Sequence, residues 1–93
     1  YKIEWIVPNA QKNDMEPILL TLHPGAKSME MVSHSGEEFG YVLKGTIMLV
    51  IGSQSYRVKA KETFYIDGTK SHYLMNPGSA DARLLWITTP RMF

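Results

Sequence analysis

The chain has 93 residues, which suits one domain and is too short for two. Ten basic and nine acidic residues leave a net charge of +1, so no strong field favours nucleic acid or an anionic membrane. The absence of cysteine excludes disulfides, zinc fingers and thiol nucleophiles. No apolar run reaches the ~18 residues that a membrane span needs. We therefore expect a cytoplasmic domain that does not contact a membrane.

Period-two spacing of apolar residues runs along nearly the whole chain and predicts strands rather than helices. In chain order, the expected strands cover residues 3–7, 15–22, 29–34, 39–44, 46–51, 54–58, 63–66, 72–75 and 82–89. Gly52-Ser53 is typical of a type II′ hairpin turn. About nine short strands with frequent turn signals predict an all-β antiparallel sandwich or barrel.

Two of the three histidines lie at expected strand ends. His34 and Glu38 are four residues apart and share strand parity, so both can face one side of adjoining strands. His72 joins them only if the barrel closes. A His/Glu/His set with open coordination positions suits Zn²⁺, Mn²⁺, Fe²⁺ or Ni²⁺. We therefore predict His34, Glu38 and His72 as metal ligands. In the alternative, the three side chains form a hydrogen-bonded polar cluster in the barrel mouth that binds a ligand directly.

Two runs resemble the two motifs of the cupin superfamily. Residues 34–45, His-Ser-Gly-Glu-Glu-Phe-Gly-Tyr-Val-Leu-Lys-Gly, resemble the first motif, and residues 61–76 resemble the second. Flanking segments from Met15 and up to Pro90 extend the similarity over nearly the whole chain. The resemblance implies one cupin domain over residues 1–93, folded as a small antiparallel β-barrel or double-stranded jelly roll.

The Gly-Glu-Glu-Phe-Gly-Tyr-Val-Leu block and the Leu-Trp-x-x-Thr-Pro ending are similar to the C-terminal cupin domains of bacterial XRE-type helix-turn-helix transcriptional regulators. In that family the cupin senses a small molecule or shapes a dimer, and a separate N-terminal domain binds DNA. The chain begins with Tyr1 instead of methionine. We therefore expect a fragment of a homodimeric regulator, with its helix-turn-helix domain upstream and a small-molecule effector in the barrel.

Some positions depart from the cupin motifs. Val32 stands where the family often has its first histidine, which leaves three of four usual ligands. Lys61, Asp67 and Thr69 stand where the second motif usually has Gly, Pro and Gly. Gly40, inside an expected strand, predicts a bulge or a close approach by a ligand.

The predicted ligand-binding residues lie in the barrel mouth beside the histidines; they are Val32, Tyr41, Leu74 and Trp86. Glu37 is expected to face solvent, opposite to Glu38. Two other functions stay open at this point. One is a stand-alone metal-dependent isomerase or dioxygenase, in which the metal would carry the chemistry because no dedicated nucleophile or acid–base pair is present. The other is dimerisation without any ligand.

Overall fold

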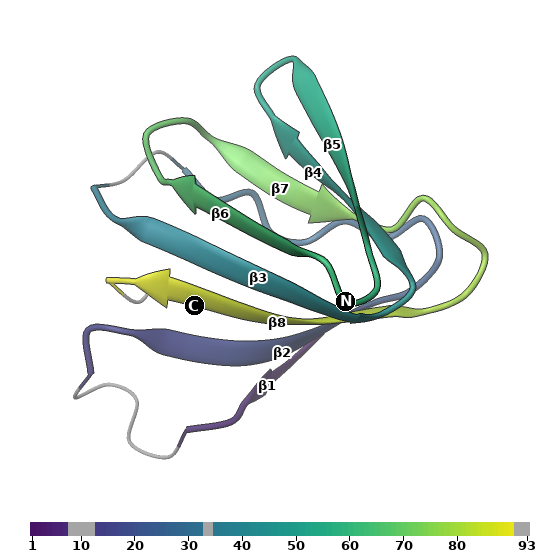
Figure 1. Ribbon diagram of the computed structural model, residues 1–93, viewed down its shortest axis with the longest axis horizontal. Coiled ribbons are helices and arrows are strands. Elements are labelled where there is room, and N and C mark those ends of the chain that lie inside the picture. Colours follow the sequence, from purple (N-terminus) through teal and green to yellow (C-terminus); the bar gives the residue numbers. More distant parts are fainter. Residues whose placement is uncertain (8–12, 33–34, 91–93) are drawn as a thin grey trace.

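Eight β-strands form the molecule over the residues that the computed structural model describes, which are 1–7, 13–32 and 35–90 (Figure 1). In chain order they are β1 (Lys2–Trp5), β2 (Glu16–Leu22), β3 (Glu37–Lys44), β4 (Thr46–Ile51), β5 (Gln54–Lys59), β6 (Thr63–Asp67), β7 (His72–Met75) and β8 (Ala82–Thr89). No helix occurs in these ranges, and so none is long and apolar enough to cross a membrane.

The strands make two antiparallel sheets that face each other (Figure 1). The larger sheet has five strands in the order β1-β2-β8-β3-β6, and the smaller has three in the order β5-β4-β7. β8 lies between β2 and β3. The C-terminal strand β8 therefore pairs with one strand from the N-terminal part of the chain and with one from its middle. Such non-sequential neighbours are the crossovers of a jelly-roll arrangement.

The core lies between the two sheets because alternate residues of each strand point inward. Ile18, Leu20 and Leu84 are fully buried on the larger sheet, and Ile47 and Leu74 are fully buried on the smaller one. The alternating burial agrees with the period-two spacing that predicted strands, and several strand ends, including those of β4, β7 and β8, match the expected ones.

The segment expected as a strand over residues 29–34 is not a named strand in its described part. Met31 instead forms an isolated bridge with His72, and its N–H donates to the His72 carbonyl at 2.7 Å. This brings the described count to eight against about nine expected. The Gly52-Ser53 turn is as predicted: Gly52 has a φ of +58°, and Ser53 is not among the residues with positive φ, which is the type II′ pattern.

Among the described residues, hydrogen bonds do not close the two sheets into a continuous barrel. β5 ends the smaller sheet and β6 ends the larger one, and in the described chain neither pairs with the other. The two strands are joined by a turn at 59–62, where the Glu62 N–H donates to the Lys59 carbonyl at 2.9 Å. The sandwich is therefore open along one side, between β5 and β6.

Gly40 lies in regular strand pairing, so the predicted bulge is wrong, and the group that packs against it is the Phe64 ring. Gly40 pairs in regular register with Phe64 and with Trp86. A Cβ at Gly40 would lie 2.0 Å from Cε2 of Phe64. The Phe64 ring therefore covers the glycine, because only a residue without a side chain leaves room for it.

Candidate ligand-binding site

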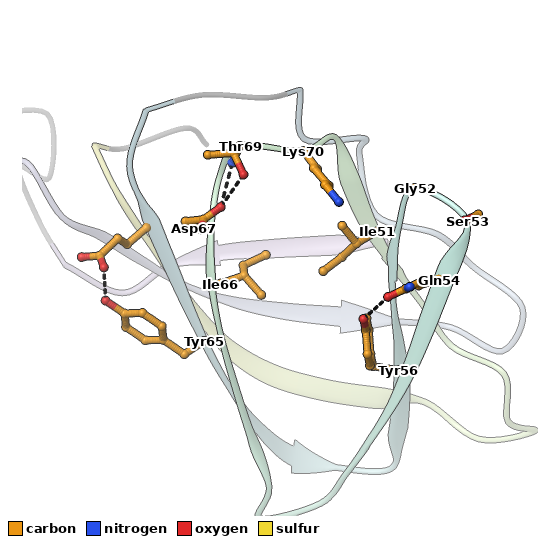
Figure 2. Close-up of a pocket in the computed structure, with 11 residues that line it drawn as sticks. Ile51, Gly52, Ser53, Gln54, Tyr56, Tyr65, Ile66, Asp67, Thr69 and Lys70 are labelled. Carbon is orange, nitrogen blue, oxygen red and sulfur yellow. Dashed lines mark hydrogen bonds between the residues drawn. The ribbon is translucent and has the colours of Figure 1, made fainter.

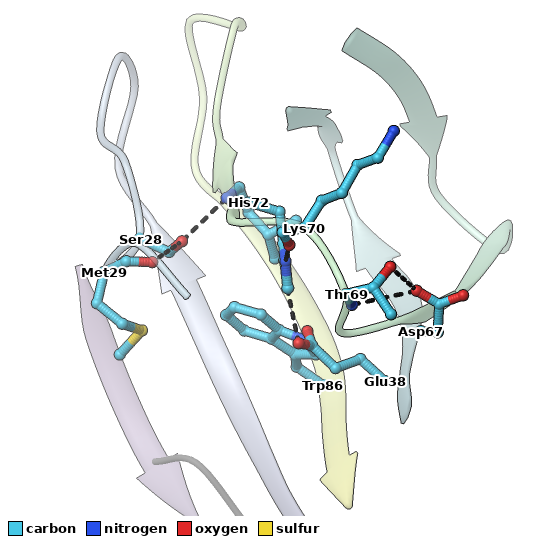
Figure 3. A network of polar contacts seen from close by, with 9 residues as sticks. Ser28, Met29, Glu38, Asp67, Thr69, Lys70, His72 and Trp86 are labelled. Carbon is cyan, nitrogen blue, oxygen red and sulfur yellow. Dashed lines mark hydrogen bonds and ion pairs between the residues drawn. The ribbon is translucent and has the colours of Figure 1, made fainter. Parts of the chain in front are cut away.

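The side chains of Glu38 and His72 meet in the interior, one from each sheet (Figure 3). Nε2 of His72 lies 2.6 Å from Oε2 of Glu38, and the two side chains are 1% and 0% exposed. The other carboxylate oxygen, Oε1, accepts a hydrogen bond from the indole N–H of Trp86 at 2.9 Å. Both oxygens of Glu38 thus have a donor or a protonatable partner, as a buried carboxylate requires.

The second ring nitrogen of His72 fixes the position of one proton. Nδ1 lies 2.8 Å from the Lys70 carbonyl, which only accepts, so Nδ1 carries a proton. Burial lowers the pKa of His72, but the hydrogen bond to Glu38, the hydrogen bond to the Lys70 carbonyl and the Glu38 charge together outweigh it and leave the pKa raised. A raised pKa favours the protonated, positively charged form of His72. His72 and the Glu38 carboxylate therefore form a buried ion pair.

Two further polar residues share this end of the interior. Glu16 pairs with Thr88 in register, and Thr88 pairs with Glu38, so the three lie in one row across β2, β8 and β3. All three are buried, Glu16 at 5% exposure and Thr88 at 0%. The sequence analysis did not predict Glu16 and Thr88 as interior residues. Strand parity could have identified them, because each lies at an inward-facing position of its own strand.

The structure brings together two of the three predicted metal ligands. Glu38 and His72 are in contact, whereas His34 lies outside the described residues. Within the described ranges, no group of three or more His, Cys, Asp and Glu residues is arranged to hold a metal ion. The prediction of a three-ligand site therefore stays a prediction.

The four predicted ligand-binding residues occupy different surroundings. Trp86 and Leu74 are fully buried beside the polar pair, and Val32 is 63% exposed after the Met31 bridge. Tyr41 lies on the outer face of the sheet. It is three positions after the inward-facing Glu38 on β3, and side chains alternate between the two faces along a strand. The structure thus separates Tyr41 and Val32 from the interior pair.

An open cavity of about 710 Å³ lies along the unclosed side, between the β4–β5 hairpin and β6 (Figure 2). Its floor includes Ile51 and Ile66. Ile51 is the register partner of His72, and Ile66 is the register partner of Glu38. The cavity therefore lies next to the buried polar pair, on the same inner faces.

Polar groups surround this apolar floor. They are contributed by Glu37, Gln54, Tyr56, Tyr65, Asp67, Thr69 and Lys70. The Tyr56 hydroxyl donates to Gln54, and Oδ1 of Asp67 accepts from the backbone N–H and the hydroxyl of Thr69 (Figure 2). These hydrogen bonds lower the pKa of the Asp67 carboxyl. An apolar floor with a few placed polar groups is typical of small-molecule sites.

An adjoining cavity of about 430 Å³ continues the opening along β5 and β6. It shares Ile51, Tyr56 and Ile66 with the first cavity and adds Leu49, Val58 and Phe64 from the core. The two together form a trough over the interior, with the edge of β5 on one side and the edge of β6 on the other. Sequence reasoning did not identify this trough, because it depends on two strand edges that stay unpaired.

The sequence profile of the cupin domain family matches residues 18–88. The chain belongs to the cupin family. The match spans the inner rows of both sheets and both members of the buried polar pair, which confirms the family that the two motifs predicted.

This cupin is similar along nearly its whole length to part of a known regulator. It is 33% identical over 89 residues to the HTH-type transcriptional regulator PuuR of Escherichia coli K12, a match that covers 95% of the cupin and 48% of PuuR. The chain thus spans about half the length of that curated relative. A shorter match, 34% identical over 68 residues, covers 14% of the mannose-1-phosphate guanylyltransferase RfbM of Salmonella typhimurium.

Solved structures confirm the cupin fold. The cupin domain of an XRE family transcriptional regulator from Enterobacter cloacae superposes with a TM-score of 0.84 at 18% identity, covering 98% of this cupin and 97% of that chain. An HTH_3 family transcriptional regulator from Vibrio cholerae gives a TM-score of 0.81 at 18% identity, covering 98% of this cupin and 51% of that chain.

Proposed function

We propose that this cupin is the small-molecule-sensing domain of a DNA-binding transcriptional regulator, and that its effector binds in the trough between β5 and β6. The observation that carries the proposal is a ligand-sized cavity next to a buried polar pair, in a chain that aligns with half of a helix-turn-helix regulator. A helix-turn-helix domain outside the printed sequence would supply the contacts to DNA.

The chemistry of the trough suggests how an effector is held. Its apolar part packs on Ile51 and Ile66, and its polar groups meet Gln54, Tyr56 and the Lys70 ammonium at the rim. Filling the trough links two sheets that no strand pairing joins at this side. An effector that binds one arrangement of the two sheets more tightly than another shifts the population toward that arrangement. In this proposal, the shift is the signal passed to the DNA-binding domain.

A binding screen tests this proposal. Isothermal titration of the chain against a panel of small metabolites should find a binder, and Ile66→Trp, which fills the trough, should weaken it at least about 10-fold. Leu43→Trp, on the outer surface, is the matched control and should bind normally. The proposal fails if no member of the panel binds at millimolar concentration, or if a binder is indifferent to Ile66→Trp.

The metal that the cupin family suggests does not fit the two described ligands as they stand. Two atoms that share one metal at bonds of ~2.1 Å lie about 3 Å or more apart, whereas Nε2 of His72 and Oε2 of Glu38 are 2.6 Å apart, a hydrogen-bond distance. Elemental analysis of purified protein tests the three-ligand prediction, and about one metal ion per chain would support both it and the metal-dependent enzyme.

A further inference from the structure

The two ends of the trough differ in polarity. The cavity of about 710 Å³ holds the amide and ammonium groups of Gln54 and Lys70. The second cavity, of about 430 Å³, runs on to Val58 and Phe64, and Arg57 is the one charged residue among its described lining. Arg57 precedes the buried Val58, so it stands at an outward-facing position of β5. The trough is therefore polar at one end and apolar at the other.

The inner face of β5 offers hydrogen-bond donors at the polar end. Gln54 and Tyr56 pair in register with Ile51 and with the buried Leu49, so both stand at inward-facing positions. The Tyr56 hydroxyl donates to Oε1 of Gln54 (Figure 2). The amide nitrogen of Gln54 therefore keeps two N–H groups for a further acceptor.

Lys70 supplies the positive charge at this end. Its carbonyl lies 2.8 Å from Nδ1 of His72, which holds the Lys70 backbone next to the buried pair. The ammonium takes part in no ion pair among the residues that the structure describes, and its side chain extends from the loop toward Ile51 (Figure 2). Ile51 has Gln54 as its register partner on one side and His72 on the other. Lys70 and Gln54 therefore flank the apolar floor.

The two carboxylates at the rim are bonded within the protein and start from the outer face. Glu37 and Asp67 are register partners, and both are exposed. Glu37 accepts from the Tyr65 hydroxyl, and Asp67 accepts twice from Thr69. The bonds from Thr69 lower the pKa of Asp67 more than the Lys70 charge does. The charge that meets the apolar floor is therefore that of the Lys70 ammonium.

We propose that the trough selects an amphipathic carboxylate, whose head accepts hydrogen bonds from Lys70 and Gln54 and whose hydrocarbon tail lies toward Phe64. The inference rests on the proposed function, because it places the effector in the same trough. An ammonium and an amide that converge on one anion give charge-assisted hydrogen bonds. The stretch of β5 from Gln54 to Val58 is roughly 13 Å long at ~3.3 Å per residue, which accommodates an extended octanoate.

Three probes with the same tail test the choice of head group. In isothermal titration of the 93-residue chain, octanoate should bind at least about 10-fold more tightly than octylamine or octanol. Butanoate should bind at least about 10-fold more weakly than octanoate, because it leaves the apolar end of the trough empty. The proposal is overturned if octanoate does not bind at millimolar concentration, or if octylamine binds as well as octanoate or better.

A lysine substitution tests the role of the ammonium. Lys70→Gln should weaken octanoate at least about 10-fold and leave the weaker octanol binding unchanged, because only the anion uses the charge. Lys59→Gln makes the same change at an outward-facing position of β5 that lines neither cavity, and it should leave both probes unchanged. Loss of octanol together with octanoate, or the same loss of octanoate in both variants, contradicts the assigned role of Lys70.

A charge introduced at Gln54 should invert the preference. Gln54→Glu keeps nearly the same shape but sets a second carboxylate against the head group, so octanoate should weaken at least about 10-fold and octylamine should tighten. Ser55→Glu adds the same charge one residue away, on the outer face, and should change neither.

Ile66→Trp separates the two proposals. If this variant weakens octanoate while Lys70→Gln and Gln54→Glu do not, the trough is the site but the ligand class is wrong, and the sensing proposal survives. If octanoate binds and is indifferent to Ile66→Trp, the trough is not its site and both proposals fail.

Discussion

Glu38 and His72 join the two sheets through one contact of 2.6 Å between Oε2 and Nε2, with both side chains excluded from solvent. We expect Glu38→Gln to lower the free energy of unfolding by about 2–4 kcal/mol, because it leaves a buried imidazole without its charge partner. Urea unfolding measures this loss. Glu37→Gln, one residue away on the exposed face, is the matched control and should cost at most about 0.5 kcal/mol. Equal effects from the two variants would contradict the buried ion pair.

Lys61 adopts a left-handed backbone with a φ of +70°. It is the third residue of the 59–62 turn, a position that in a type II turn favours glycine. We expect Lys61→Gly to stabilise the protein by about 1 kcal/mol, since a side chain in this conformation costs about 1–2 kcal/mol. The midpoint of urea unfolding should rise.

Lys59→Gly is the control for that substitution. It changes the same residue type at the end of strand β5, where the backbone is extended, and should destabilise the protein by about 0.5–1 kcal/mol. If both glycine variants moved stability in the same direction, conformational preference at Lys61 would not be the cause.

Gly40 and Phe64 form a packed pair in which the glycine has no substitute. Gly40→Ala sets a methyl group 2.0 Å from the Phe64 ring, so the ring must leave its place. We expect a loss of about 1–3 kcal/mol. Phe64→Leu in the Gly40→Ala background should cost less than in the parent, because the smaller side chain makes room for the methyl group. Strict additivity of the two substitutions in a double-mutant cycle would refute this contact.

Asp67 provides a test by titration. Its carboxyl accepts two hydrogen bonds from Thr69, at 3.1 and 2.6 Å, and these hold its pKa below the ordinary value. A lowered folded-state pKa gives a stabilising contribution that is complete above the ordinary pKa of about 3.9 and is lost as pH falls through the folded value. Thr69→Ala should raise the pKa of Asp67 toward 3.9 in a carboxyl NMR titration. Ser71→Ala, which removes a hydroxyl from the same loop, should not move it.

Strand parity explains how much of the site could be predicted from the sequence. Parity separated Glu37 from Glu38 correctly and placed Glu38 in the interior. The family motifs placed His72 beside it, although 33 residues lie between the two in the chain. Parity also should have excluded Tyr41 from the interior, since it lies three positions after Glu38 on one strand; the prediction was made from residue type instead.

The trough could not be predicted in the same way. Its floor depends on register, which sets Ile51 beside His72 and Ile66 beside Glu38. Its opening depends on two strand edges that do not pair, and period-two spacing is the same in a paired and an unpaired strand. Gly40 was assigned to a bulge or a ligand because a glycine in a strand gives no sign of which side chain covers it.

Within the part of the chain that the structure describes, strand β5 pairs through its backbone on one side only, with β4. Amide hydrogens along its other edge therefore face no partner strand, and β5 can open while β4 stays paired with β7. In deuterium labelling, β5 should exchange ahead of the central strands β2 and β8. The side of the molecule proposed to bind the effector is thus expected to be its least protected part, and slower exchange there would indicate a bound ligand.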